Sequence, residues 1–502
     1  MVGLIAGSRK SMSETARKFE LLFNPRSLAL IGASANPYKW GSVILSHIIT
    51  GGFRGKIYPV NPREEEIQGL AAYPGVAALP EVPDLAVIVT PPSSVPAVLE
   101  DCGKKGIKAG VIITAGFAEV GADGARLEQE MVRIARREGI VLVGPNCFGI
   151  ISTGCKLCSI MPPLFPLPGP FAIVSQSGNV ASSIASKLIS RDLGISKLIS
   201  SGNEADLHCE DYLEYLAGDR DTKIILSYIE GFRDGRRFFE VAKRVTPIKP
   251  IVMLKAGYTS AGAKAAKSHT ASLAGSDAVF ASACKQAGII RVRDMDELFN
   301  VGAALLCQPL PRGKRVAILT AGGGWGVLGA DACANAGLNV TQLPEETMAE
   351  LNAFLPPWWS HGNPVDLVAG VFQENVMKTV EVLLRCTAVD SLMLLNLVPA
   401  LPQSIVLVSD KSSLSGEEVR TFDDALGDVL ARLAALVNKH HKPIILAWEF
   451  GFEPIDARLR EVAYQKGIPC YPLPDHATAV LSSLARYAEY RANLNPAPSP
   501  QA

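Results

Sequence analysis

Short apolar runs, rich in β-branched residues, alternate with longer segments of helical periodicity along the chain. This alternation predicts an α/β fold with parallel sheets, because strands that helices cover on both faces are apolar at nearly every position. Three sets of strands are expected: one at residues 28–32, 56–60, 85–90, 110–114 and 140–144; a second at 171–175, 197–200, 224–229, 250–254 and 289–292; and a third whose clearest members are 315–320, 391–397 and 443–448.

Proline-rich stretches separate these sets, at residues 162–170 and again at 309–313. Residues 172–179 and 317–324 also match in residue type, each with a strand, a turn of small residues and the start of a helix, which indicates two similar domains in tandem. We therefore expect an N-terminal extension at 1–19, α/β domains at 20–150, 151–308 and 309–494, and a disordered tail at 495–502.

Composition narrows the class of protein. The 502 residues hold 49 Lys and Arg against 49 Asp and Glu, so no net charge favours binding to nucleic acid or to an anionic membrane. The first twenty residues hold no apolar signal-peptide stretch, and no later run reaches the length of a membrane span. Ten scattered cysteines indicate reduced thiols and a cytoplasmic protein, and the single pair Cys155 and Cys158 is interpreted as ordinary loop cysteines.

The first predicted strand ends in Gly32-Ala33-Ser34, a tight turn at the start of a helix, where backbone amides can approach a phosphate. The second strand ends at Asn61, where an NAD enzyme usually has an acidic residue for the ribose hydroxyls. Lys39 and Arg63 stand where they can meet further phosphates. The turn is therefore structural, an NAD site, or a site for another phosphate-bearing nucleotide, and the last is favoured.

Four motifs in the order Gly32-Ala33-Ser34, 59–62, 90–92 and 144–147 resemble the CoA-binding domain of the succinyl-CoA synthetase superfamily. The resemblance covers roughly residues 20 to 150 and implies a Rossmann-like fold that binds coenzyme A. The CoA-binding residues that it implies are Gly32, Ala33, Ser34, Lys39, Asn61, Arg63, Thr90, Pro91, Thr114 and Ala115.

In the second domain, His269 lies in a segment of small and hydroxylated residues that leaves its imidazole accessible. A lone histidine is more often structural, but the strand at 224–229 ends at Glu230, whose carboxylate can fix the tautomer and make Nε2 the nucleophile. Turns at 175–179 and 200–204 follow strands at the same sheet edge, and each can open a helix whose N-terminus binds a phosphoryl group or is simply capped.

This segment resembles the phosphohistidine domain of succinyl-CoA synthetase and, more closely, of ADP-forming acetyl-CoA synthetase. The resemblance implies two flavodoxin-like domains after the CoA-binding domain, phosphorylation of His269, and orientation of that histidine by Glu230. No metal-ligand residue stands three or four positions from His269, so no metal site is expected. Ala271 stands where the family usually has Gly, a departure that is not expected to remove activity. Trp325 stands where the family usually has Pro, so no ligand role is expected for the turn at 320–326, and the third domain is interpreted as an interface for a partner or for neighbouring domains. The implied phosphate-binding residues are Ser175, Ser177, Gly178, Asn179, Gly202 and Asn203.

By this resemblance, the chain is expected to be the α-type subunit of an acyl-CoA synthetase that interconverts acyl-CoA, phosphate and ADP with a carboxylate, CoA and ATP. An acyl phosphate and a phosphohistidine are the implied intermediates. Nothing in the sequence resembles an ATP-grasp domain, which implies a separate ATP-grasp β-type subunit that holds Mg²⁺ with ADP or ATP. A non-catalytic CoA-binding regulator of the same fold is the alternative. A third class of protein, an NAD-dependent oxidoreductase, is disfavoured by Asn61.

Overall fold

The computed structural model describes residues 14–259, 261–262, 264, 276–368, 373–397, 416–449 and 455–494. Its three main sheets are largely parallel, which confirms the predicted α/β class. The chain divides into two compact units, residues 1–291 and 292–502, and the first unit contains the first two sheets. The predicted domain boundaries stay predictions. Among the described helices, none is long and apolar enough to cross a membrane.

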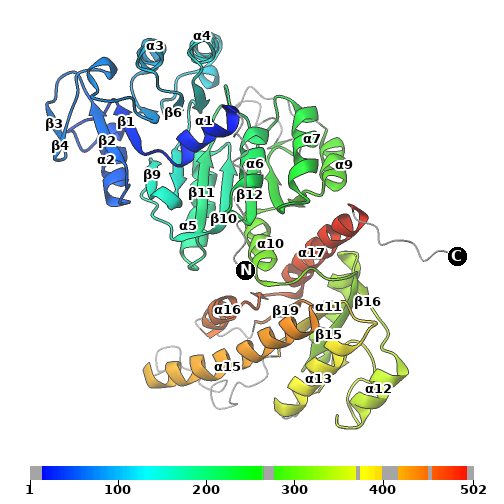
Figure 1. Ribbon diagram of the computed structural model, residues 1–502. Coiled ribbons are helices and arrows are strands. Elements are labelled where there is room, and N and C mark those ends of the chain that lie inside the picture. The colour runs from blue at the N-terminus through cyan, green and yellow to red at the C-terminus, as the bar shows by residue number, and fades with distance from the viewer. Residues whose placement is uncertain are drawn as a thin grey trace, which may run out of the picture. The chain divides into compact units, whose positions relative to one another are not determined.

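The first sheet has the order β2-β1-β5-β6-β7, and all its pairs are parallel. Leu28 and Leu30 of β1 face the core that α1 and α2 cover, whereas Ala29 and Ile31 face α3 and α4, so the strand is buried on both faces (Figure 1). The elements are α1 (Glu14–Phe23), β1 (Ser27–Ile31), α2 (Trp40–Thr50), β2 (Lys56–Val60), the small ribbon β3 (Glu66–Ile67) and β4 (Leu70–Ala71), β5 (Leu85–Ile88), α3 (Val95–Lys105), β6 (Ala109–Ile112), α4 (Ala122–Glu138) and β7 (Val141–Val143).

The second sheet has the order β14-β13-β12-β10-β11-β8-β9. Its core strands are parallel, but β8 and β9 form an antiparallel hairpin at one edge, which the sequence pattern did not predict. Cys158 therefore lies in a buried strand and not in a loop. The elements are β8 (Gly149–Ser152), β9 (Leu157–Ile160), β10 (Pro168–Ser175), α5 (Gly178–Ile189), β11 (Ile195–Ser200), α6 (Cys209–Gly218), β12 (Ile224–Ile229), α7 (Gly235–Val245), β13 (Ile251–Lys255), α9 (Asp277–Ala287) and β14 (Ile290–Val292).

The third sheet, in the second unit, has the order β16-β15-β18-β19-β20, with β17 also paired to β15, and its pairs are parallel. The elements are α10 (Met295–Cys307), β15 (Arg315–Thr320), α11 (Gly323–Asn335), β16 (Asn339–Val340), α12 (Glu345–Asn352), β17 (Val365–Asp366), α13 (Gln373–Arg385), β18 (Ser391–Leu395), α15 (Gly416–His440), β19 (Ile444–Ala447), α16 (Ile455–Gln465), β20 (Cys470–Tyr471) and α17 (Pro474–Leu494). The strands predicted at 315–320, 391–397 and 443–448 are β15, β18 and β19.

The tandem repeat that the sequence indicated is also present in the hydrogen bonds. Ser175 Oγ donates to Ser177 O and accepts from Ser177 N, at 2.7 and 3.2 Å. Thr320 Oγ1 does the same with Gly322 O and Gly322 N, at 3.1 and 3.2 Å. A hydroxyl at the last position of the strand therefore closes the turn before the helix in both domains.

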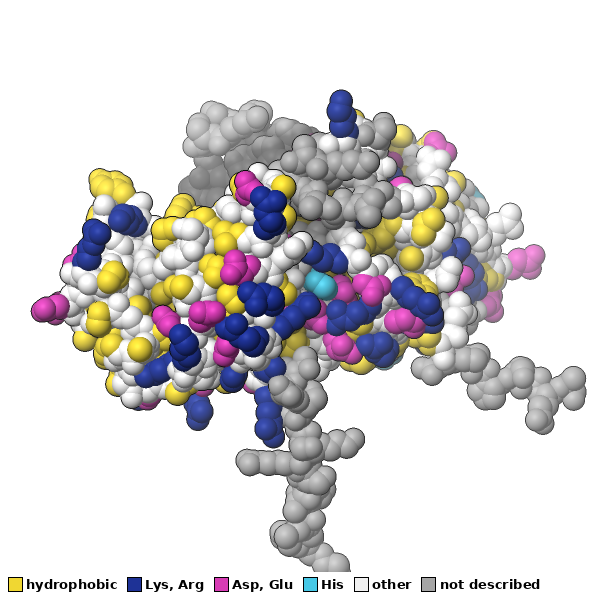
Figure 2. Space-filling view, turned by 90° about the horizontal axis from the view of Figure 1, so that it is seen from above, with side chains coloured by type: hydrophobic (Ala, Val, Ile, Leu, Met, Phe, Trp, Pro, Cys, Tyr) yellow, Lys and Arg dark blue, Asp and Glu magenta, His cyan; other side chains and the backbone are white. Residues whose placement is uncertain are grey.

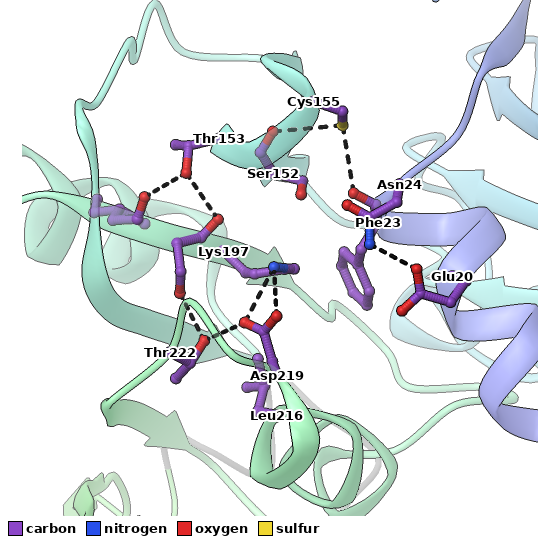
Figure 3. Close-up of polar contacts among 12 residues, drawn as sticks. Glu20, Phe23, Asn24, Ser152, Thr153, Cys155, Lys197, Leu216, Asp219 and Thr222 are labelled. Carbon is purple, nitrogen blue, oxygen red and sulfur yellow. Dashed lines mark hydrogen bonds and ion pairs between the residues drawn. The ribbon is translucent and has the colours of Figure 1, made fainter. Parts of the chain in front are cut away.

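A buried ion pair ties β11 to the end of α6 in the first unit (Figure 3). Lys197 Nζ donates to both carboxylate oxygens of Asp219, at 3.0 and 3.1 Å, and the Lys197 side chain is only 1% exposed. Thr222 Oγ1 donates a further bond to Asp219. Nearby, Cys155 Sγ donates to the carbonyl of Phe23 at the end of α1. Helix α1 begins at Glu14, so it crosses the predicted limit of the N-terminal extension at residue 19.

Candidate functional site

The residues expected to bind CoA lie at one edge of the first sheet. Gly32, Asn61, Thr90 and Thr114 follow β1, β2, β5 and β6, and parallel strands that are paired in one sheet end at the same edge. Lys39 is the residue before α2. Both Lys39 and Arg63 are exposed. The fold therefore brings these predicted positions to one edge of the first sheet.

The turn between β1 and α2 depends on two glycines. Gly32 has a φ of +95°, and its N–H donates to Val60 O at 3.1 Å. A Cβ added at Gly41, in the first turn of α2, would lie 2.0 Å from the carbonyl oxygen of Gly32. Helix α2 therefore begins directly against the turn, which directs the positive end of its dipole toward the same edge.

Asn61 is engaged in building this turn. Its Nδ2 donates to Ala33 O at 2.7 Å, and its Oδ1 accepts from Arg63 N at 2.8 Å. No carboxylate stands at this position to bind ribose hydroxyls, which agrees with the argument against an NAD site. Thr114 Oγ1 donates to Thr90 O at 2.7 Å and joins the two following loops.

The first phosphate turn follows β10. Ser177 is the N-cap of α5, and its hydroxyl accepts from Val180 N at 3.4 Å. Gly178 is the first helical residue, and a Cβ there would lie 2.3 Å from the ring of Phe148. The N-cap, one of the two expected roles of this turn, is therefore present, and it leaves the first N–H groups of the helix, at Gly178 and Asn179, without intrahelical partners.

The second turn, after β11, does not open a helix as expected, because α6 begins only at Cys209. The segment is instead paired with the end of β7. Asn203 N, Ala205 N and Leu207 N donate to the carbonyls of Pro145, Gly144 and Leu142, at 3.0, 3.1 and 3.3 Å. These backbone bonds hold residues 203–207 in an irregular loop, in which Glu204 has a φ of +52°, so the segment is not helical. Of the two turns, only the first supplies a helix N-terminus.

Gly202 and Asn203 stand at the start of that segment. Gly202 has a φ of +60°, and a Cβ there would lie 2.3 Å from Pro145 O. The Asn203 Nδ2 group donates to Glu119 at 2.6 Å and to Glu128 at 2.9 Å, so both of its protons are in use. A direct contact between this side chain and a phosphoryl group would require these bonds to be exchanged.

Glu119 connects the two predicted sites. One of its carboxylate oxygens accepts from Asn203, and the other accepts from the backbone N–H groups of Gly116 and Phe117, at 2.5 and 3.1 Å. Burial acts to raise the pKa of Glu119, but these hydrogen bonds outweigh it and hold the pKa below the usual range. The loop after β6 and the turn after β11 are therefore joined through one ionised carboxylate.

Glu230 follows β12 at the same edge as the first turn. Its backbone N–H donates to Gln176 Oε1 at 2.6 Å, so the end of β12 is bonded to the turn after β10. Burial, the Glu230 charge and a hydrogen bond to it raise the pKa of Tyr228 to about 12. His269 and Ala271 lie outside the described residues.

Gln176 and Glu204 are site residues that the sequence reading missed. Gln176 Nε2 donates to Glu204 Oε2 at 2.9 Å, and Glu204 Oε1 accepts from Ser201 Oγ at 2.7 Å. Burial raises the pKa of Glu204 to about 7 against these hydrogen bonds. The only signal in the sequence was an amide and a carboxylate within the two turns, and their contact joins positions 28 residues apart.

Charges elsewhere on this unit are mixed. Figure 2 shows a face on which Lys and Arg side chains are interspersed with Asp and Glu. A surface pocket of about 370 Å³ includes Glu128, Arg136 and Arg233 in its lining. Arg233 pairs with Glu128 at 3.2 Å and Arg136 with Asp206 at 3.5 Å, so two of its cations are already neutralised.

The corresponding turn of the third domain differs in charge. A Cβ at Gly323 would lie 3.1 Å from Asp366 Oδ2, so a carboxylate stands beside the first residue of α11. A negative group at this position opposes binding of a phosphate there. Among the described residues, no group of three or more His, Cys, Asp or Glu side chains is arranged to hold a metal ion.

Comparison with known proteins agrees with this architecture. Family models match a CoA binding domain at residues 26–153, a succinyl-CoA ligase like flavodoxin domain at 168–305 and a ligase-CoA domain at 316–421. With the strand-end turns described above, these matches define a protein of the succinyl-CoA ligase class.

Individual relatives narrow the class. Acetate–CoA ligase (ADP-forming) II subunit alpha of Pyrococcus furiosus is 41% identical over 472 residues, which are 94% of this chain and 98% of the relative. Acetate–CoA ligase (ADP-forming) of Methanocaldococcus jannaschii is 43% identical over 71% of this chain and 50% of its own length. The dinucleotide forming acetyl-coenzyme A synthetase 1 of Ca. Korarchaeum cryptofilum, solved with phosphate and ADP, matches with a TM-score of 0.82 and 35% identity, over 95% of this chain and 98% of that one.

The chain belongs to the family of α subunits of ADP-forming acetate–CoA ligases. Its predicted fold, a Rossmann-like CoA-binding domain followed by two flavodoxin-like domains, is confirmed, as is its class as an acyl-CoA ligase. Nothing in these comparisons supports the regulatory alternative.

Proposed function

We propose that this chain carries the CoA site and the phosphoryl-transfer histidine of an acyl-CoA synthetase, and that a separate ATP-grasp β-type subunit completes the enzyme. The observation that carries the proposal is the edge of the second sheet, where the N-terminus of α5 and the backbone of Glu230 are joined by Gln176. The proposed enzyme interconverts acyl-CoA, phosphate and ADP with a carboxylate, CoA and ATP.

Coenzyme A fits the edge of the first sheet. The turn after Gly32 offers small residues and the start of α2 to a phosphate, with Lys39 and Arg63 exposed beside it. Thr90 Oγ1 is buried and makes no hydrogen bond to the described residues, so a ligand atom at this edge would satisfy it. Ala33, Ser34, Asn61, Pro91, Thr114 and Ala115 complete the proposed CoA-binding set.

The phosphoryl chemistry belongs to the second sheet. A phosphate oxygen attacks the thioester carbonyl, the carbon–sulfur bond breaks, and the thiolate takes a proton as CoA departs. Nε2 of His269 then attacks phosphorus, and the acid leaves as its carboxylate. Glu230 holds the proton of Nδ1 and stabilises the charge that forms on the ring. The free N–H groups at Gly178 and Asn179, with Ser175, Ser177, Gly202 and Asn203 around them, are the proposed phosphoryl site.

The final transfer needs a partner. His269 passes its phosphoryl group to ADP, which the ATP-grasp subunit would hold together with Mg²⁺. Support comes from the relatives: two from Pyrococcus furiosus are named as α subunits and are covered to 98%, whereas this chain covers half of the Methanocaldococcus jannaschii protein. A cytoplasmic location follows from the nucleotide and CoA that the reaction uses. The acid is not specified.

ATP formation tests this function. The chain is co-purified with an ATP-grasp subunit and supplied with phosphate, ADP, Mg²⁺ and a panel of acyl-CoAs, and ATP is followed by luminescence. ATP is expected with at least one acyl-CoA, and omission of this chain or His269→Ala is expected to abolish it. ATP formation that survives His269→Ala, or no ATP with any acyl-CoA, contradicts the proposal.

A further inference from the structure

The carboxamide of Gln176 uses all of its hydrogen-bonding capacity on two segments, residues 230–231 after β12 and Glu204 after β11. Oε1 accepts from Glu230 N and Gly231 N, at 2.6 and 3.2 Å. Nε2 donates to Gly231 O and Glu204 Oε2, both at 2.9 Å. The orientation of the amide is unambiguous, because its oxygen faces two N–H groups and its nitrogen faces two acceptors.

Glu204 in turn fixes the direction of this amide. Glu204 is only 4% exposed, so its carboxylate lies inside the sheet edge and not in solvent. Its backbone adopts a φ of +52°. Ser201 Oγ bonds to the other carboxylate oxygen, and Ser201 N donates to Ser175 O at 2.8 Å. The turns after β10, β11 and β12 are therefore joined through two side chains.

We propose that Gln176 is a positioning residue for phosphoryl transfer, which holds the backbone of Glu230 and Gly231 while Glu204 holds Gln176. The inference rests on the proposed function of Glu230 and His269. A carboxylate that orients an imidazole must keep its place within a few tenths of an ångström, and Glu230 sits after the last residue of β12, where the ladder no longer fixes it. Gln176 supplies the missing backbone bonds.

The state of Glu204 affects the strength of this support. As a carboxylate, Glu204 accepts a charge-assisted bond from Gln176; when protonated, it is a weaker acceptor. The titratable groups that face it are His208, Cys209 and Tyr212, all at or near the start of α6. Burial raises the pKa of Glu204 to about 7, so its state changes in the range where the enzyme can be assayed.

The experiment measures the rate at which the chain, in its complex with the ATP-grasp subunit, is labelled by ³²P-phosphate and a reactive acyl-CoA. Gln176→Met keeps the length of the side chain and removes every hydrogen bond, and Gln465→Met on the exposed part of α16 is the matched control. The rate is expected to fall about 100-fold in Gln176→Met, by analogy with small misplacements at catalytic groups, while the Kd for CoA is unchanged. The control variant is expected to behave as wild type.

A second pair of variants tests Glu204. Glu204→Gln keeps an acceptor for Gln176 without a titration, and Glu204→Leu removes the acceptor. The labelling rate of the wild type is expected to rise with pH through about 7, to become flat in Glu204→Gln, and to fall at every pH in Glu204→Leu.

The outcomes distinguish the positioning role of Gln176 from the proposed function of the chain. Labelling of Gln176→Met at the wild-type rate, or loss of CoA affinity together with the rate, overturns the positioning role. A pH limb that persists in Glu204→Gln overturns the part given to Glu204 and assigns the limb to a neighbour such as His208. Absence of label in the wild type, with CoA still bound, contradicts the proposed function itself and not the role of Gln176.

Discussion

At the scale of single residues, the site depends on backbone positions that sequence patterns mark well and on side-chain contacts that they do not. Gly32 and Gly202 could be singled out because each follows an apolar run, and each has a positive φ. Gln176 and Glu204 could not, because an amide and a carboxylate in a turn have many solvated alternatives. Their significance lies in burial and in each other.

Glu204 gives a prediction about stability and pH. Its folded pKa of about 7 lies above the usual carboxyl range, so between about pH 4.3 and 7 the folded state binds a proton that the unfolded state releases. Stability from this group is therefore present at low pH and is lost as the pH rises through 7. Relative to Glu204→Gln, which cannot titrate, the free energy of unfolding of the wild type should fall by about 2–3 kcal/mol between pH 5 and pH 8.

The measurement is the urea midpoint at each pH, reported by hydrogen-exchange protection of the amides of β12. The wild type and Glu204→Gln should diverge from pH 5 to about pH 7, and the difference should then level off toward pH 8. Parallel curves for the two proteins would show that Glu204 does not titrate in this window.

At the scale of secondary structure, the apolar runs predicted every strand of the first sheet, the parallel strands β10 to β14 of the second, and β15, β18 and β19 of the third, because buried parallel strands have a simple signature. The β8–β9 hairpin and the irregular loop at 203–207 escaped prediction for a common reason. Both are held by pairing with strands distant in the sequence, β11 in one case and β7 in the other. Small and polar residues before α6 are compatible with a helix start, and tertiary pairing decides against it.

The ion pair of Lys197 and Asp219 is the element-scale feature with the largest predicted effect. The two side chains are 1% and 10% exposed, so removal of one leaves the other charge buried without its partner. Lys197→Met or Asp219→Leu alone is expected to cost about 3–5 kcal/mol of unfolding free energy. The double variant Lys197→Met/Asp219→Leu should recover much of that loss, because an apolar pair avoids desolvating two charges.

A double-mutant cycle on urea unfolding, again followed through β12, measures this coupling. Additive losses in the double variant would show that the two charges do not depend on each other.

At the scale of the whole molecule, the repeated strand, turn and helix at Ser175 and Thr320 shows how one local plan serves two purposes. The hydroxyl that closes the turn is the same in both domains. The surroundings differ. At the first turn, Glu230 follows the neighbouring strand β12, and its backbone N–H is bonded to Gln176 of the turn. At the second turn, Asp366 lies beside Gly323, the first residue of α11. The class of enzyme followed from motifs in order, but the contacts that connect the CoA edge to the phosphoryl edge, through Glu119 and Asn203, needed the structure.

The proposed function requires the phosphoryl group to pass through His269. The most direct test is to incubate the chain with ³²P-phosphate, CoA and a reactive acyl-CoA, and to identify the labelled residue by mass spectrometry under neutral conditions. We expect an acid-labile, base-stable label on the peptide that contains His269, and no label in His269→Ala. Label on another residue, or label that persists in His269→Ala, would contradict it.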